Sequence, residues 1–154
     1  MLSEYQTKPA ISFGHGRDYY KAKNYAQAFN CYLKAAEGGN IIAQYEVGFC
    51  LFGGIGVDRD ELMGFHWMHQ AAKNGSCEAL NFLGVFYAEG WSDWLEIDFA
   101  EAYKFFILAR RQGDKNAICW LATVRTWASL RQKAEGRKRA QEFISLFLNN
   151  QPKL

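Results

Sequence analysis

Residues 35–40 of this 154-residue chain read AAEGGN, residues 71–76 read AAKNGS and residues 108–113 read LARRQG. The second stretch follows the first by 36 residues, and the third follows the second by 38. The same steps relate other small residues, namely Ala43, Ala79 and Ala117, and then Gly48, Gly84 and Ala122. Recurrence at a fixed period of 20–50 residues is the signature of repeat architectures. The chain is therefore predicted to be an array of similar units.

Each unit is predicted to hold two helices. In the second unit Ala43, Val47 and Leu51 recur at helical spacing, and the glycine-rich segment 53–57 interrupts the pattern. Asp58 or Asp60 is placed to cap the next helix, and Asp98 does the same in the third unit. The pattern predicts an all-α chain of eight helices, near residues 10–22, 25–37, 40–52, 60–73, 76–88, 98–111, 116–132 and 136–149.

The composition agrees with a helical array. Only two prolines occur, Pro9 and Pro152, and both lie near the ends, so the units between them contain no residue that must break a helix. Aromatic residues make up 16% of the chain, and the repeat places six of them at packing positions. These are Tyr19, Tyr32, Trp67, Tyr87, Phe105 and Phe143.

Charge is distributed unevenly along the chain. The formal net charge is +2, but residues 1–102 hold 7 Lys and Arg against 13 Asp and Glu, whereas residues 103–154 hold 11 against 3. The densest basic run, residues 131–139, is the best candidate for a nucleic-acid contact, with solvated helix faces as the alternative. No signal peptide and no membrane-spanning stretch is expected, and the four cysteines form no metal or disulfide pattern, so a cytoplasmic location is predicted.

No catalytic or cofactor motif stands out. His66 and His69 are spaced like two ligands, but a zinc site needs three or four, and no cysteine or carboxylate is placed to complete one. Neither a Ser–His–Asp arrangement nor a phosphate-binding loop is found. We therefore expect a protein that is not an enzyme and that uses neither a metal nor a cofactor.

At these residues the chain resembles the Sel-one-like repeat family, a relative of the tetratricopeptide repeats. The second unit carries most of the family pattern: Ala43, Val47-Gly48, Leu51, Gly54, Gly56-Val57, Asp60, Gly64, Trp67, Ala71-Ala72 and Gly75. The resemblance implies one domain over residues 1–154, a right-handed α-α superhelix (solenoid) of about four helix-turn-helix repeats. The repeats lie near residues 10–39, 40–75, 76–113 and 114–149.

The resemblance also implies where a partner binds, because the first helix of each pair lines the concave face in this family. The positions carried over are Arg17, Tyr20, Tyr45, Phe49, Phe52, Glu78, Asn81, Val85, Thr123 and Trp127. For the aromatic members, packing between repeats is the alternative. The acidic connection of the third unit, with Trp91, Asp93 and Trp94, either tucks against the neighbouring helices or forms a second contact site.

The sequence thus predicts a protein-protein interaction module, or adaptor, that holds a partner protein or peptide in a concave groove. Two alternatives stay open: an immunity protein that neutralises a cognate bacterial toxin by direct binding, and a nucleic-acid binder that uses the basic C-terminal helices. A bacterial, cytoplasmic protein without a membrane partner is expected, either as a monomer or as a weak homo-oligomer.

Overall fold

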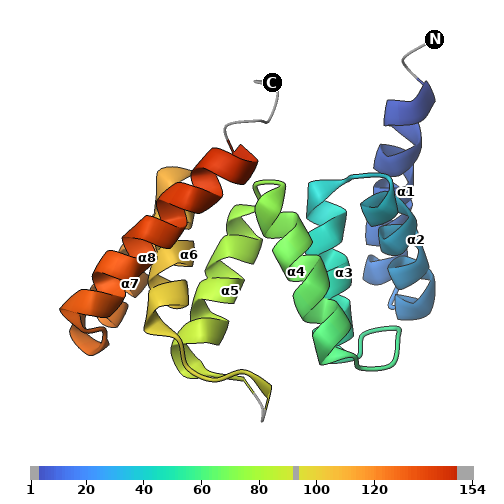
Figure 1. Ribbon diagram of the computed structural model, residues 1–154. Helices are drawn as coiled ribbons and strands as arrows, with labels where there is room; N and C mark the ends of the chain where they lie inside the picture. Colours follow the sequence, from blue (N-terminus) through green and yellow to red (C-terminus); the bar gives the residue numbers. More distant parts are fainter. Residues whose placement is uncertain (1–3, 92–93, 149–154) are drawn as a thin grey trace. The chain divides into compact units, whose positions relative to one another are not determined.

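The computed structural model describes residues 4–91 and 94–148, which form eight α-helices and one π-helical turn (Figure 1). The elements are α1 (Glu4–Lys21), α2 (Tyr25–Glu37), α3 (Ile41–Gly53), α4 (Glu61–Lys73), α5 (Cys77–Glu89), α6 (Phe99–Arg111), α7 (Asn116–Trp127), α8 (Leu130–Phe143) and η2 (Ile144–Leu148). They divide into two compact units, Met1–Ala71 (the N-terminal unit) and Ala72–Leu154 (the C-terminal unit). Each unit is described by itself.

Local side-chain caps set where the helices begin. The Asn40 side chain accepts a hydrogen bond from the Ala43 backbone N–H at 2.9 Å, and Ser76 does the same for Ala79 at 3.1 Å. Asp60, one of the two predicted caps of α4, accepts from Met63 at 2.9 Å, and Asp98 accepts from the first turn of α6. Each cap satisfies a backbone donor that has no partner within the helix.

The boundaries of α1, α7 and α8 differ from the prediction. α1 begins at Glu4, so Pro9 lies inside it, and α7 ends at Trp127 five residues before its predicted end. The break is a capping box: Ser129 accepts from the Gln132 N–H at 3.2 Å, and the Gln132 side chain accepts from the Ser129 N–H at 2.8 Å. This reciprocal pair starts α8 at Leu130, and the basic run 131–139 is consequently helical.

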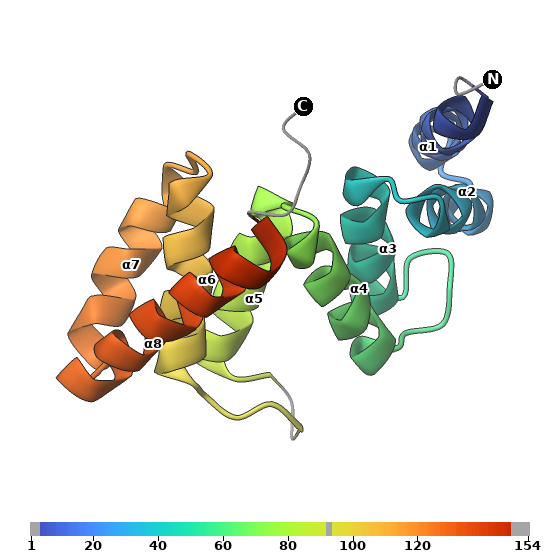
Figure 2. The same ribbon diagram turned by 45° about the horizontal axis from the view of Figure 1, so that its top comes forward.

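In the N-terminal unit, α3 and α4 run side by side and are joined by the loop of residues 54–60 (Figure 2). They approach closely because two glycines face each other: a Cβ on Gly48 would lie 3.0 Å from the Gly64 carbonyl oxygen. Gly56 is required in the loop for two reasons. Its φ is +72°, and a side chain there would meet the Tyr25 carbonyl of α2 at 2.1 Å.

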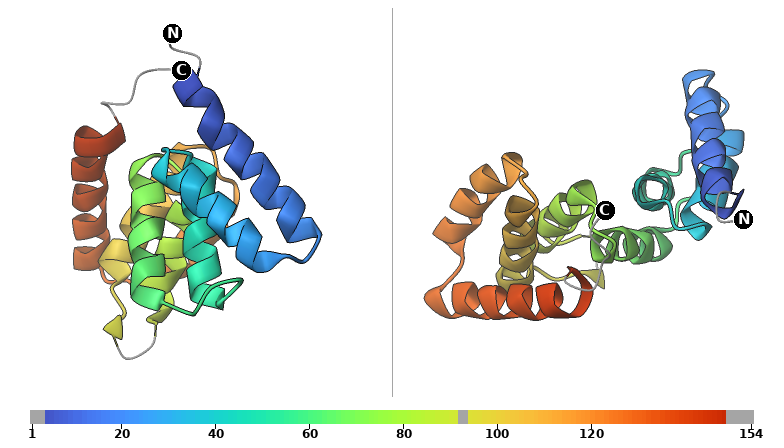
Figure 3. Two further views of the ribbon diagram at one scale, coloured as in Figure 1. Left: turned by 90° about the vertical axis from the view of Figure 1, so that its right-hand side faces the viewer. Right: turned by 90° about the horizontal axis from the view of Figure 1, so that it is seen from above.

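In the C-terminal unit, α6 is the central helix, and Phe105, Phe106 and Leu108 on it are fully buried. α5 and α6 pack where Gly84 has no side chain, since a Cβ on Gly84 would lie 2.6 Å from the Phe106 ring. Helices α7 and α8 also pack on α6, and they diverge from their junction near Ser129 (Figure 3).

Most of the aromatic residues predicted to pack do so. Tyr32, Phe105 and Phe143 are buried, and Trp67 and Tyr87 are half-buried. Tyr19 is the exception, because 39% of its surface is exposed on α1.

Replacing Gly84 with alanine is expected to lower the free energy of unfolding by about 1–2 kcal/mol, because the clash with Phe106 outweighs the higher helix propensity of alanine. Gly14→Ala on α1 is the control, since a Cβ there meets nothing within 4 Å, and it is expected to stabilise by up to about 1 kcal/mol. Urea unfolding followed by circular dichroism measures both. Equal or higher stability of Gly84→Ala would contradict the close approach of α5 and α6.

Candidate functional site

A pocket of about 450 Å³ opens on the N-terminal unit between α1 and α3. Arg17 and Tyr20 on α1 line one side, and Ile42 and Glu46 on α3 line the other. Tyr32 of α2 contributes to its wall. The pocket therefore joins apolar surface to charges of both signs, which is the composition of many peptide-binding sites.

Aromatic side chains continue this face along α3. The rings of Tyr45 and Phe49 stack with their centroids 6.3 Å apart, and 39% of Phe49 is exposed. Tyr20 has the same exposed fraction and meets the Tyr25 ring edge-on at 5.2 Å. Four of the ten predicted contact positions, Arg17, Tyr20, Tyr45 and Phe49, thus lie on α1 and α3, and we call this surface the α1–α3 face.

Phe52 does not belong to this surface, and its prediction as a contact residue is wrong. It is buried, with 8% of its surface exposed. Its ring lies where Gly64 of α4 has no side chain, since a Cβ on Gly64 would be 3.1 Å from Phe52 Cδ2. The glycine of the repeat leaves room for the ring, so Phe52 contributes to the packing of α3 on α4.

The predicted positions on α5 divide in a similar way. Glu78 is exposed, whereas Val85 is half-buried against the cluster that surrounds Tyr103 and Phe106. The side-chain amide of Asn81 donates to the Asp114 carboxylate within the same unit. This hydrogen bond ties α5 to the connection between α6 and α7.

On α7, Thr123 is half-buried, and its hydroxyl donates to the Cys119 carbonyl at 3.1 Å. Trp127 is 56% exposed and lies beside Phe99, with ring centroids 6.2 Å apart. Of the positions predicted on α5 and α7, only Glu78 and Trp127 are exposed.

The start of the connection between α5 and α6 packs against α5. Trp91 stacks on Phe86 with ring centroids 4.4 Å apart, and its backbone pairs with Leu95 through hydrogen bonds of 3.0 and 3.2 Å. Trp94 is half-buried. Asp93 lies outside the described residues. Of the two predicted alternatives, the contacts of Trp91 favour the tucked loop.

Part of the basic run is neutralised within the C-terminal unit. Arg139 donates through Nη1 to Asp98 Oδ2 at 3.1 Å and to Glu101 Oε1 at 2.8 Å, and through Nε to Glu135 at 3.0 Å. These bonds join α8 to the start of α6 and raise the pKa of Arg139 further above its usual range. Arg139 is therefore an internal contact, and Asp98 and Glu101 are paired within the unit.

Within residues 4–91 and 94–148, no group of three or more His, Cys, Asp or Glu side chains is arranged to hold a metal ion. His69 packs edge-on against Phe65 at 4.6 Å. No helix in this part of the chain is both long enough and apolar enough to cross a bilayer.

A second pocket lies in the C-terminal unit among α6, α7 and α8. No pattern in the sequence predicted it. Three arginines, Arg110, Arg125 and Arg137, line it together with apolar side chains. The only signal in the sequence was the excess of basic residues after Tyr103, which does not reveal which of them share one cavity.

Comparison with known proteins identifies the repeat. The model of the Sel1 repeat matches three successive segments, residues 10–40, 41–76 and 77–114. Among curated proteins, the chain is 28% identical to the Rattus norvegicus protein named DAP3-binding cell death enhancer 1, over 73% of this chain and 29% of that protein. The chain therefore spans less than a third of the length of this relative.

Two solved structures share the fold. A protective antigen of uropathogenic Escherichia coli strains, which displays an SLR fold, aligns with a TM-score of 0.82 and 22% identity over 97% of this chain and 34% of that one. A Sel1 repeat protein from Oxalobacter formigenes aligns with a TM-score of 0.68 and 28% identity over 79% and 93%. The predicted fold class, an all-α solenoid of helix-turn-helix repeats, is confirmed.

Replacing Arg139 with glutamine is expected to lower the free energy of unfolding by about 1 kcal/mol at low salt, because three carboxylates lose their shared partner. Lys138→Gln is the matched control: Lys138 is exposed on the same helix, so a change below about 0.5 kcal/mol is expected. The difference is expected to shrink in 1 M NaCl, as ion pairs are screened by salt. Equal effects of both substitutions would contradict the network.

The buried phenol of Tyr32 predicts a loss of stability at alkaline pH. Burial, followed by the charge of Glu46, raises the pKa of Tyr32 from 10.0 to about 12. The neutral phenol thus stabilises the fold below pH 10, and this contribution is lost as the pH rises from 10 through 12. Tyr32→Phe is expected to lose less stability than the wild type between pH 9 and pH 11 in urea unfolding. An equal loss would refute this role of Tyr32.

Proposed function

Because the chain belongs to the Sel1 repeat family, we propose that it binds a partner protein through the α1–α3 face of its N-terminal unit. Sel1 repeats generally mediate protein–protein interactions, and they form a non-catalytic scaffold. The proposed ligand is a peptide segment of the partner that enters the pocket of about 450 Å³ and lies along α3.

The observation that carries this proposal is the stacked pair of Tyr45 and Phe49 on α3, the helix whose Ile42 and Glu46 line that pocket. Aromatic side chains on an exposed face offer a large contact area and lose little conformational entropy on binding, so they are enriched among residues that dominate binding energy. Ile41 and Ile42 at the start of the same helix are 37% and 57% exposed and extend the apolar surface.

The charges around the pocket would orient the peptide. Arg17 and Lys21 lie on the α1 side, and Glu46 lies on the α3 side. Such groups at the rim of an apolar surface contribute more to specificity than to affinity. A segment with an apolar centre and a charged residue near it fits this arrangement.

A nucleic-acid function receives less support. Arg139, in the middle of the basic run, is engaged by Asp98, Glu101 and Glu135. A phosphate contact would have to compete with three carboxylates for the same guanidinium group.

A peptide-display selection on the purified chain tests the proposed function. We expect peptides that bind with micromolar dissociation constants, and we expect Tyr45→Ala with Phe49→Ala to weaken them at least tenfold, or about 1.4 kcal/mol. The matched control is Leu62→Ala with Met63→Ala, which removes two apolar side chains that are 65% and 47% exposed on α4.

The control variant is expected to bind within about threefold of the wild type, and circular dichroism shows whether each variant is folded. Selection of no peptide, or equal weakening by the two double variants, would overturn the proposal. Fluorescence anisotropy with one selected peptide provides the dissociation constants.

A further inference from the structure

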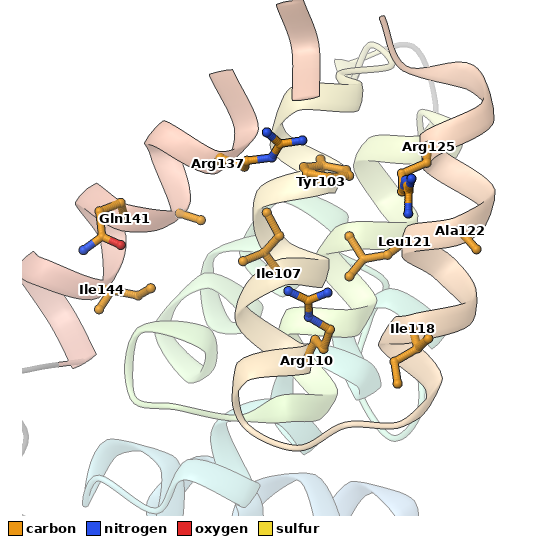
Figure 4. Close-up of a pocket in the computed structure, with 11 residues that line it drawn as sticks. Tyr103, Ile107, Arg110, Ile118, Leu121, Ala122, Arg125, Arg137, Gln141 and Ile144 are labelled. Carbon is orange, nitrogen blue, oxygen red and sulfur yellow. The ribbon is translucent and has the colours of Figure 1, made fainter. Parts of the chain in front are cut away.

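The pocket of the C-terminal unit is built from three matching stripes of side chains, one from each of its last three helices (Figure 4). Each stripe uses positions spaced three or four residues apart, which lie on one face of a helix. The stripes are Tyr103, Ile107 and Arg110 on α6; Ile118, Leu121, Ala122 and Arg125 on α7; and Arg137, Ala140, Gln141 and Ile144 on α8 and η2. Together they enclose about 400 Å³.

Every stripe has an arginine at one end, and its other side chains are mostly apolar, with Gln141 on α8 as the exception. Arg110 is the last pocket residue of α6, Arg125 is the last of α7, and Arg137 is the first of α8. Figure 4 shows the three guanidinium groups around a floor of Tyr103, Ile107 and Leu121. Arg110 follows Tyr103 by seven residues, so the stripe on α6 is roughly 10 Å long.

The three arginines carry charge that the described part of the chain does not neutralise. All three are exposed, none forms an ion pair with a described residue, and no carboxylate belongs to the described lining of the pocket. Arg139, two residues after Arg137 and therefore on another face of α8, shows the contrast because it meets three carboxylates. Exposed guanidinium groups with free donors are suited to carboxylates, which they bind in a bidentate manner.

The apolar lining of the pocket favours a peptide over a nucleic acid as the anionic ligand. Ile107 is half-buried and Ile118 is 57% exposed, so a ligand that covers them removes apolar surface from water. A nucleic acid would stack its bases on aromatic rings. Among the described lining residues the one aromatic side chain, Tyr103, is 7% exposed and has the Arg137 guanidinium 6.0 Å from its ring centre. Its ring is therefore covered on the side where a base would need to stack.

We propose that this pocket binds an acidic peptide segment. Its apolar side chains would rest on Ile107 and Ile118, and its carboxylates would meet Arg110, Arg125 and Arg137. The site would give the chain a second contact for a protein partner. It rests on the proposed function only in that the ligand is a peptide, since it shares no residue with the α1–α3 face.

The test uses the full chain and a fluorescein-labelled ten-residue peptide in which glutamate and leucine alternate. We expect a dissociation constant in the micromolar range that rises with salt concentration. Replacing Arg110, Arg125 and Arg137 together with glutamine is expected to weaken binding at least tenfold. The matched control replaces Arg111, Arg131 and Lys138, three exposed cations on α6 and α8 that do not line the pocket, and is expected to change binding less than threefold.

Two further probes separate the floor from the charge. A peptide with serine in place of leucine is expected to bind at least fivefold more weakly, and a single-stranded oligonucleotide of equal charge is expected to bind more weakly than the glutamate–leucine peptide. Absence of peptide binding to the wild type, equal weakening by the two triple variants, or tighter binding of the oligonucleotide would each overturn the proposal.

The two proposals fail separately. Tyr45→Ala with Phe49→Ala is expected to leave the binding of the glutamate–leucine peptide unchanged. Loss of the selected peptides together with retained binding of the acidic peptide would refute the α1–α3 face alone, and the reverse result would refute the arginine pocket alone.

Discussion

Helices of this chain touch at positions that carry no side chain, and the rest of its packing depends on that contact. Gly48 and Gly64 bring the backbones of α3 and α4 together in the N-terminal unit, and Gly84 admits the ring of Phe106 in the C-terminal unit. A close approach of this kind excludes flexible side chains from the contact. Large rings then fill the space beside it, as Tyr32 does next to Gly16 and Phe52 does next to Gly64. Density in the core comes from this pairing of a missing side chain with a large one.

The same constraint explains why an apolar face is left outside. α3 buries Val47, Cys50 and Leu51 against its neighbours. Tyr45 and Phe49 do not belong to that cluster, and only part of their surface is covered. A helix that is apolar on both faces is either fully buried or bound to something on its second face. In the N-terminal unit this second face is the surface that we propose for partner binding.

The basic residues differ in whether they form ion pairs, and this difference is independent of how the helices pack. The basic residues of the last third of the chain look equivalent in the sequence, but the structure divides them into two groups. Arg139 meets carboxylates that also cap or begin α6, so it contributes to the joint of two helices. Arg110, Arg125 and Arg137 surround an apolar floor instead, where a ligand would have to supply the missing negative charge. Distance from the carboxylates of α6 therefore separates Arg139, which joins two helices, from the three arginines that we propose bind a ligand.

By itself, the sequence was sufficient for the repeat, the all-α class, most helix boundaries and the caps at Asp60 and Asp98. The boundaries and caps depend on signals within four residues of each other, and the repeat depends on a recurrence that can be read directly along the chain. The resemblance to the repeat family predicted Arg17, Tyr20, Tyr45 and Phe49 as contact positions, and the structure leaves all of them exposed except Tyr45, which is half-buried. The capping box of Ser129 and Gln132 was not predicted, although these two residues are only three positions apart. The helical pattern of the sequence continues past them and hides the break. The tertiary structure alone decided that Phe52 is covered, that the Asn81 donor is occupied by Asp114 and that three arginines share one pocket. Each of these outcomes depends on which residue of another helix lies opposite, and spacing along one helix contains no information about that.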